Sequence, residues 1–195
     1  MESRPLSVEG SDRFSAEVCF GRLYEHYHRH VVAYCRRRVV ADQVDDVVAE
    51  TFLTTWRRID DVPADGAALP WLYRVAYRAI GHQWRGASRR RRLDARLASF
   101  RDRPASSPAD TAVQGDEIRR VLAAAAELNG SDAEILRLVS WEHLSYAEIT
   151  EVLDIAPNAV KQRVHRARTN LTKEFDRLER RRPIRTPAAQ KGGTP

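Results

Sequence analysis

Long apolar runs, clustered cysteines and a signal-like start are all missing from this sequence, and each absence excludes a class of protein. No run of about 18 apolar residues is present to span a membrane, and residues 1–12 lack the basic-then-apolar order of a signal peptide. Cys19 and Cys35 are the only cysteines, and they lack the spacing of a zinc site. We therefore expect a soluble cytoplasmic protein with two free thiols, both buried among apolar helical residues.

The sequence also lacks stretches in which apolar and polar residues alternate between hairpin turns, which argues against strands. Apolar residues instead recur at steps of three and four, in two blocks separated by a segment rich in Pro, Ser, Ala and Asp. We predict an all-α chain of two small helical domains joined by a flexible linker. The expected parts are a flexible N-terminus 1–13, a first domain 14–100, a linker 101–115, a second domain 116–180 and a disordered tail 181–195.

A net charge of +6 favours an anionic partner, although charge alone does not choose between nucleic acid and a membrane. Part of this charge lies on one side of a helix expected to start near Leu69, at Arg74, Arg78, His82 and Arg85. Aromatic rings beside such arginines can stack on the bases of a single strand, at roughly 1–3 kcal/mol each. A solvated arginine face over core tryptophans is an equally open interpretation. The flanking aromatic residues are Trp71, Tyr73, Tyr77 and Trp84.

A second helix in the first block has one apolar face and one acidic face. The apolar positions are Val44, Val47, Val48, Phe52, Thr55, Trp56 and Ile59, and the acidic positions are Asp42, Asp45, Asp46 and Glu50. Three of these carboxylates are four residues apart, which leaves a metal-dependent hydrolase or nuclease as one hypothesis. No histidine, activated nucleophile or glycine-rich phosphate loop accompanies them, so we expect no enzyme, no metal and no cofactor. A solvated acidic face is the simpler alternative.

The second block carries two Ser-x-x-Glu patterns, Ser131 to Glu134 and Ser145 to Glu148, each of which predicts a capping box at a helix start. The second of them opens a helix over 146–153, which stops at residues 154–156. Pro157 then suits the first position of another helix. The pattern predicts a helix, a short turn and a helix.

In the last helix Val160, Val164, Ala167 and Leu171 face the core by their spacing. The outward side chains are suited to a DNA major groove, where Lys, Asn and Gln reach base edges and arginines hold phosphates. A basic face that binds nothing is the alternative, and the turn spacing together with the polar composition favours DNA. The outward residues are Asn158, Lys161, Gln162, His165 and Arg168, with Arg163 and Arg166 as further phosphate contacts.

Four segments together resemble the extracytoplasmic-function (ECF) group of sigma factors, in the sigma-70 family of bacterial transcription initiation factors. DDVVAETFLTTWRR (45–58) resembles the family's acidic helix, and LPWLYRVA (69–76) resembles the start of its promoter-melting helix. LSYAEI (144–149) and VKQRVHRAR (160–168) resemble its helix-turn-helix signature. The resemblance covers about residues 20–175 and rests on the order and separation of these segments.

The resemblance implies an initiation factor without catalytic activity. In the family, the first domain docks on the clamp helices of the largest subunit of core RNA polymerase and melts the minus-10 element, and the second reads the minus-35 element as duplex. The polymerase flap and an anti-sigma factor are further partners that it suggests. Carried onto this sequence, the polymerase contacts are Asp45, Asp46 and Glu50; the minus-10 contacts are Val62, Trp71, Arg74, Tyr77, Arg78, His82 and Arg85; and the minus-35 contacts are Asn158, Lys161, Gln162, His165, Arg166 and Arg168.

The sequence departs from the family pattern at three places: Ala49 where Gln is frequent, Arg78 where Asn is usual, and Asn158-Ala159 where Gly-Thr is usual. An alternative function is a helix-turn-helix regulator that dimerises through the first block and does not bind polymerase. That alternative requires a surplus apolar face on the first block, and the sequence shows none. The linker also motivates the hypothesis that the free chain folds its two domains together until polymerase separates them.

Overall fold

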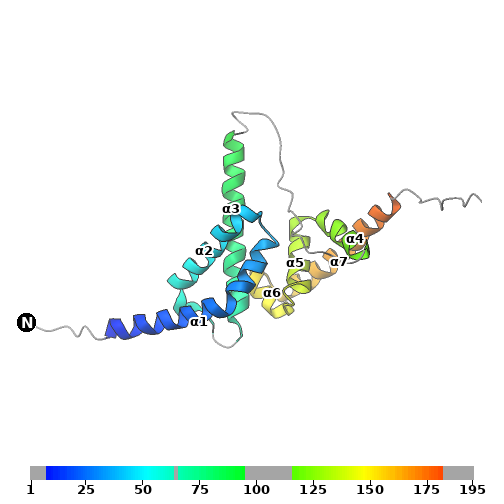
Figure 1. Ribbon diagram of the computed structural model, residues 1–195. Helices are drawn as coiled ribbons and strands as arrows, with labels where there is room; N and C mark the ends of the chain where they lie inside the picture. Colours follow the sequence, from blue (N-terminus) through cyan, green and yellow to red (C-terminus); the bar gives the residue numbers. More distant parts are fainter. Residues whose placement is uncertain (1–7, 64–65, 95–115, 182–195) are drawn as a thin grey trace, which may run out of the picture.

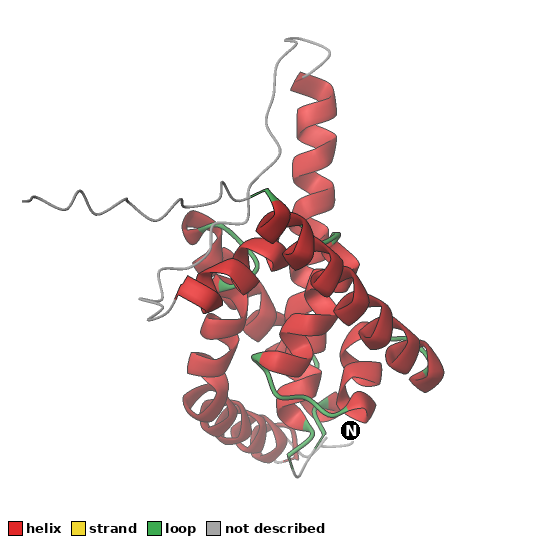
Figure 2. Cartoon of the chain, turned by 90° about the vertical axis from the view of Figure 1, so that its right-hand side faces the viewer, coloured by secondary structure: helices red, strands yellow, loops and turns green. Residues whose placement is uncertain are grey.

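The computed structural model describes residues 8–63, 66–94 and 116–181, with side chains described for 14–63, 66–84 and 117–181. All regular structure in these residues is helical, as expected (Figures 1 and 2). The expected linker 101–115 and nearly all of the expected tail lie outside the described residues. The elements are α1 (Val8–Arg36), α2 (Ala41–Arg57), the 3-10 turn η1 (Ile59–Asp61), α3 (Ala68–Asp94), α4 (Asp116–Ala126), α5 (Gly130–Ser140), α6 (Tyr146–Leu153) and α7 (Pro157–Arg180).

The first unit, α1 to α3, packs three helices around a shared apolar core. The five core positions expected on α3 are all buried, as are those expected on α2 from Val44 to Thr55. Trp56 and Ile59 are only half-buried, because α2 ends at Arg57 and the chain turns into η1. Thr51 and Thr55 are buried too, since their hydroxyls donate back to the carbonyl oxygens of Val47 and Thr51 at 2.7 and 2.8 Å. The buried α3 positions are Leu72, Val75, Ala76, Ala79 and Ile80.

The second unit, α4 to α7, contains the expected helix-turn-helix. α6 begins after Ser145, whose hydroxyl accepts from the Glu148 amide while the Glu148 carboxylate accepts from the Ser145 amide, so this capping box is confirmed. Asp154 ends α6 in the left-handed conformation (φ 56°), and Pro157 opens α7 at its first position. Val160, Val164 and Ala167 are buried as expected, whereas Leu171 is half-buried.

The capping box expected at Ser131 and Glu134 is wrong. α5 starts at Gly130, two residues earlier than a Ser131 cap would place it, and Asn129 caps it by accepting from the Asp132 amide at 2.9 Å. Glu134 is instead drawn to the first unit, where Arg38 Nε lies 3.0 and 3.1 Å from its two carboxylate oxygens. A buried carboxylate facing a buried guanidinium gains more from that charged pair than from a helix end already capped by Asn129.

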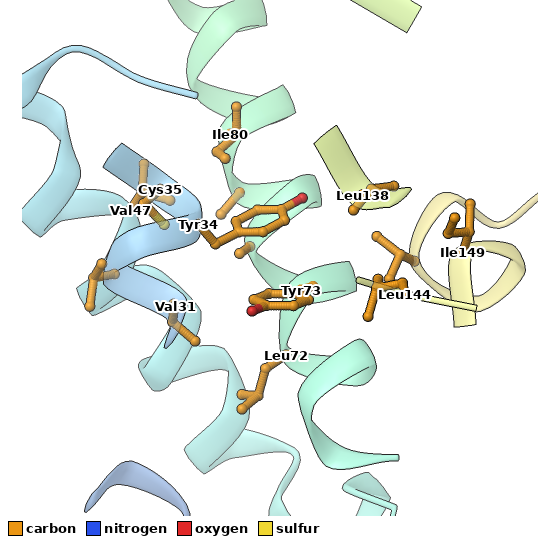
Figure 3. Packing of buried hydrophobic residues seen from close by; sticks show 14 of the residues in the cluster. Val31, Tyr34, Cys35, Val47, Leu72, Tyr73, Ile80, Leu138, Leu144 and Ile149 are labelled. Atoms are coloured by element: carbon orange, nitrogen blue, oxygen red, sulfur yellow. The ribbon is translucent and has the colours of Figure 1, made fainter. Parts of the chain in front are cut away.

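The two units pack on one another, and one apolar core runs through both. Figure 3 shows Tyr34 of α1 and Tyr73 of α3 facing Leu138 and Leu144 of the second unit. The two tyrosine rings are stacked, with centroids 4.5 Å apart. Tyr73, which the sequence assigned to the basic stripe of α3, is therefore a buried residue at the contact between the units.

The two cysteines differ, which corrects the expectation that both are buried. Cys35 is buried in the first unit, and desolvation by burial raises the pKa of its thiol to about 12. Cys19 is exposed, because this part of α1 is largely solvent-exposed, as its neighbours Phe14 and Val18 also are. Only Cys19 presents an accessible thiol.

Candidate nucleic-acid and polymerase interfaces

Helix α7 presents a polar, basic face to solvent. Asn158, Lys161, Gln162, His165 and Arg168 are all exposed, while Arg163 is half-buried. Because α6 packs against α7 on the other side of the turn, this face is held in a fixed direction relative to the second unit. An exposed helix of this kind can enter the major groove of B-DNA with its polar side chains toward the base edges.

Arg166 is held by a residue that sequence reasoning missed. Asp132 on α5 is almost fully buried, and its Oδ2 accepts from the amides of Asn129 and Asn170 at 2.8 and 2.7 Å. Its Oδ1 lies 3.6 Å from Arg166 Nε, and the Arg166 side chain remains 58% exposed. Asp132 thus ties α7 to the start of α5 through Asn170, with Arg166 as a partly exposed ion-pair partner. No local sequence signal could reveal it, since Asn170 is 38 residues away.

The basic stripe of α3 is only partly open to solvent. Arg78 and His82 are exposed, as are the rings of Tyr77 and Trp84, which is 51% exposed. Three other members of the expected minus-10 set differ: Val62 and Trp71 are half-buried and pack against the core, and the Arg85 side chain lies outside the described part of the chain.

Two arginines of this stripe contact the second unit. Arg78 Nη2 donates to Asp154 Oδ2 at 3.1 Å, and Arg74 Nη2 lies 3.2 Å from the same oxygen. Arg74 Nη1 is also 3.9 Å from Glu151. Asp154 is the residue that ends α6, so the turn of the helix-turn-helix carries the carboxylate that faces α3.

The outer face of α2 is acidic, with one large apolar residue among the carboxylates. Asp45, Asp46 and Glu50 are exposed, and Leu53, half exposed at 50%, continues the same side of the helix three residues after Glu50. Leu53 is a second residue that sequence reasoning missed, although its apolar side chain on a polar face was a visible signal. Within the described residues no group of three His, Cys, Asp or Glu side chains is arranged to hold a metal ion.

The first unit exposes more apolar surface than its sequence indicated. Besides Leu53, the side chains of Phe14, Val18 and Tyr24 on α1 are exposed, Phe14 to 70%. The sequence pattern did not reveal these exposed side chains, because a helical pattern does not show that α1 extends past its partners. Among the helices that the structure describes, none combines the length and the apolarity needed to cross a bilayer.

Comparison with known proteins matches both units. A family model for Sigma-70 region 2 matches residues 23–90, and one for Sigma-70, region 4 matches residues 118–171. RNA polymerase sigma factor NccH of Alcaligenes xylosoxydans xylosoxydans is 30% identical over 166 residues, which cover 80% of this chain and 86% of that protein. The ECF RNA polymerase sigma-E factor of Escherichia coli K12 is 29% identical over 174 residues, covering 85% and 91%.

The fold matches as well. The sigma factor RpoE of Bartonella quintana, solved in complex with the anti-sigma factor NepR, is similar over 80% of this chain and 96% of that one, with a TM-score of 0.63 and 20% identity. The match to both regions, rather than to a helix-turn-helix alone, disfavours the regulator alternative. The chain belongs to the sigma-70 family, as an ECF sigma factor that recognises promoters to initiate transcription.

Proposed function

We propose that this sigma factor divides its work among three surfaces: the acidic face of α2 binds core RNA polymerase, the basic stripe of α3 binds the minus-10 strand, and the outer face of α7 reads the minus-35 duplex. The corresponding domains are residues 14–100 and 116–180, joined by the linker 101–115. The observation that carries the proposal is that the polar side chains Asn158, Lys161, Gln162, His165 and Arg168 are all exposed on the second helix of an intact helix-turn-helix.

The face of α2 has the composition of a protein-binding surface. Asp45, Asp46 and Glu50 provide negative charge around Leu53, whose exposed side chain would be desolvated by a partner. Charged side chains around an apolar centre set the orientation and the rate of association, while the apolar centre supplies affinity. The partner that fits is a basic helical surface of core polymerase, such as the clamp helices of its largest subunit.

The α3 stripe suits a melted strand more than a duplex. Arg78 and His82 alternate with the exposed rings of Tyr77 and Trp84, which offers cations for phosphates and flat surfaces for unstacked bases. Arg74 and Arg85 extend the stripe, and Val62 and Trp71 border it. We infer that this stripe holds the minus-10 strand after the duplex opens.

The outer face of α7 provides both kinds of duplex contact. Asn158, Lys161, Gln162 and His165 have the donors and acceptors that read base edges, whereas Arg166 and Arg168 carry charge suited to phosphates. The Arg166 side chain is 58% exposed beside the buried Asp132, which leaves part of its guanidinium open to a phosphate.

The protein acts by binding and strand opening, and we assign it no chemical reaction. Its place of action is the cytoplasm, where the polymerase and promoters are. An anti-sigma factor is a further proposed partner, motivated by the similar fold of RpoE in its complex with NepR.

The experiment is co-purification with core RNA polymerase, followed by run-off transcription on genomic fragments. The wild-type chain should bind core and start transcripts at discrete sites. The Asp45→Arg, Asp46→Arg double variant should lose core binding, because two repulsive charges then face the basic partner. Glu25→Arg with Asp176→Arg changes the net charge equally at exposed sites elsewhere and should retain binding.

Two results would contradict the proposal. A wild-type chain that binds DNA but never core polymerase would restore the helix-turn-helix regulator. Equal loss of core binding in both charge-reversed variants would show that net charge matters, rather than the α2 face.

A further inference from the structure

One carboxylate in the second unit is buried with an oxygen that lacks a hydrogen bond. The Asp132 side chain is only 1% exposed, and its Oδ2 accepts from the side-chain amides of Asn129 and Asn170. Its Oδ1 is buried and accepts no hydrogen bond from any residue that the structure describes. A buried carboxylate needs a compensating charge, because water no longer solvates it. The cation that the described residues place against Oδ1 is Arg166, whose Nε lies 3.6 Å away.

Asp132 contacts one side of α7 over two successive turns. Arg166 and Asn170 are four residues apart, so their side chains lie one above the other on the helix. Gln162 precedes Arg166 by the same step and continues this side toward the start of α7. In a helix-turn-helix, the start of the second helix is the end that contacts the bases. Arg166 therefore lies between the contact with α5 and a proposed base-reading side chain.

The Arg166 guanidinium has enough donors to face both Asp132 and a phosphate. It carries five N–H groups in a rigid plane, and a contact through Nε leaves the Nη groups available. The Arg166 side chain is 58% exposed although its partner is buried, so the guanidinium lies at the boundary between the interior and the solvent. One arginine at such a boundary can be paired on its inner edge and bind DNA on its outer edge.

We propose that Asp132 is a positioning residue for the minus-35 contact: it holds Arg166 through Nε, so that the Nη groups are set toward a phosphate beside the base that Gln162 reads. The inference rests on the proposed reading of the minus-35 duplex by α7. Asp132 itself does not touch DNA, because its side chain is buried within the second unit. It acts by reducing the rotamer freedom that Arg166 loses when it binds a phosphate.

The sign of the effect separates positioning from simple electrostatics. Asp132 is negatively charged, so removing its charge should by itself strengthen the attraction of the second unit for a polyanion. Positioning predicts the opposite change, because an Arg166 side chain without its carboxylate partner must be ordered by the DNA alone. Weaker duplex binding by an Asp132→Asn variant is therefore a result that the loss of charge cannot produce.

The test uses the full chain and a fluorescein-labelled duplex, selected from a random pool, with binding followed by anisotropy. Asp132→Asn keeps the size of the side chain and one acceptor oxygen, and it should weaken duplex binding about threefold to tenfold, as expected for one long side chain that must be ordered on binding. Asp176→Asn is the matched control, since it removes the same charge from an exposed position further along α7. The control should not weaken binding.

Two further variants assign the loss to Arg166. In an Arg166→Ala background, Asp132→Asn should cause no additional loss of duplex affinity, because the side chain that it positions is absent. Asn170→Ala removes the other contact of Asp132 with α7 and leaves the Asp132 charge beside Arg166. It should lower the urea midpoint of unfolding but change duplex affinity by less than about twofold.

Arg166 can also be observed without DNA. Nitrogen relaxation of the arginine Nε–H groups gives an order parameter for each side chain. The Arg166 Nε–H should be more ordered than that of the exposed Arg168, and it should fall to the Arg168 level in Asp132→Asn. The backbone amide spectrum shows whether this variant keeps the native fold. If it does not fold, the comparison of Arg166 with Arg168 in the wild-type chain remains decisive.

Failure of the inference differs from failure of the proposed function. An Arg166 Nε–H as disordered as that of Arg168, or an Asp132→Asn variant that binds duplex as well as the Asp176→Asn control, would overturn positioning while α7 keeps its role. So would an equal loss in the Arg166→Ala background or in Asn170→Ala, because Asp132 would then act on the fold alone. A wild-type chain that selects no duplex from the pool would instead overturn the reading of DNA by α7, and with it the role of Asp132.

Discussion

At the scale of single residues, the side chains of α7 divide into base-reading and phosphate-binding groups that mutation can separate. Lys161→Ala and Gln162→Ala should each weaken binding to the preferred duplex by about 1–3 kcal/mol relative to a scrambled duplex, because each removes base-edge hydrogen bonds. Arg166→Ala should weaken all duplexes alike and reduce the slope of log affinity against log salt by about 1. The measurement is anisotropy over a salt series, on a duplex first selected from a random pool.

Lys173→Ala is the control for these variants, since it removes the same charge from an exposed position nearer the other end of α7. It should alter binding only slightly. If Lys161→Ala reduces the binding free energy by the same amount on every duplex, Lys161 contacts phosphates. The other base-reading side chains, such as Gln162, then carry the sequence preference.

At the scale of elements, two serines with the same sequence pattern have different roles. Ser145→Ala should lower the free energy of unfolding by about 1 kcal/mol, because its hydroxyl accepts from the Glu148 amide at the start of α6. Ser131→Ala should change it by less than about 0.5 kcal/mol, because Asn129 caps α5 and Ser131 is exposed. Urea unfolding followed by circular dichroism measures both, and equal losses would contradict the assignment of the caps.

These two serines also show what the sequence could predict. Helix positions and core faces were predictable, because periodicity and a local cap depend on neighbours within four residues. The start of α5 was ambiguous, because Asn129 and Ser131 are both capping residues, and Glu134, which would complete a box with Ser131, has its partner at Arg38, 96 residues earlier. Tyr73 was misplaced for the same reason: its position on α3 is compatible with the basic side, but the second unit covers it.

The candidate site was predictable to the extent that it consists of outward helix positions. The polar face of α7 and the acidic face of α2 follow from the spacing of their buried residues alone. Asp132, which pairs with Arg166, and Asp154, which faces Arg78, become relevant only through contacts between distant segments. Patterns within one helix carry no information about which helix lies opposite.

At the scale of the whole molecule, a core shared by both units predicts cooperative unfolding. Neither unit can unfold without exposing Tyr34, Tyr73 and Leu144 and without separating Arg38 from its carboxylates. The free energy needed to open the interface is therefore added to the free energy of unfolding either unit. We expect the two units to unfold in one transition, as single domains do.

Tryptophan positions make this measurable, because Trp56, Trp71 and Trp84 lie in the first unit and only Trp141 in the second. In a Trp141→Phe variant, fluorescence follows the first unit and circular dichroism follows both. The two urea transitions should coincide in this variant. They should separate when Glu134→Gln and Glu142→Gln are added, because the interface then buries Arg38 without a counterion and no longer couples the units. Separate transitions before that addition would mean that the shared core does not join the units into one folding unit.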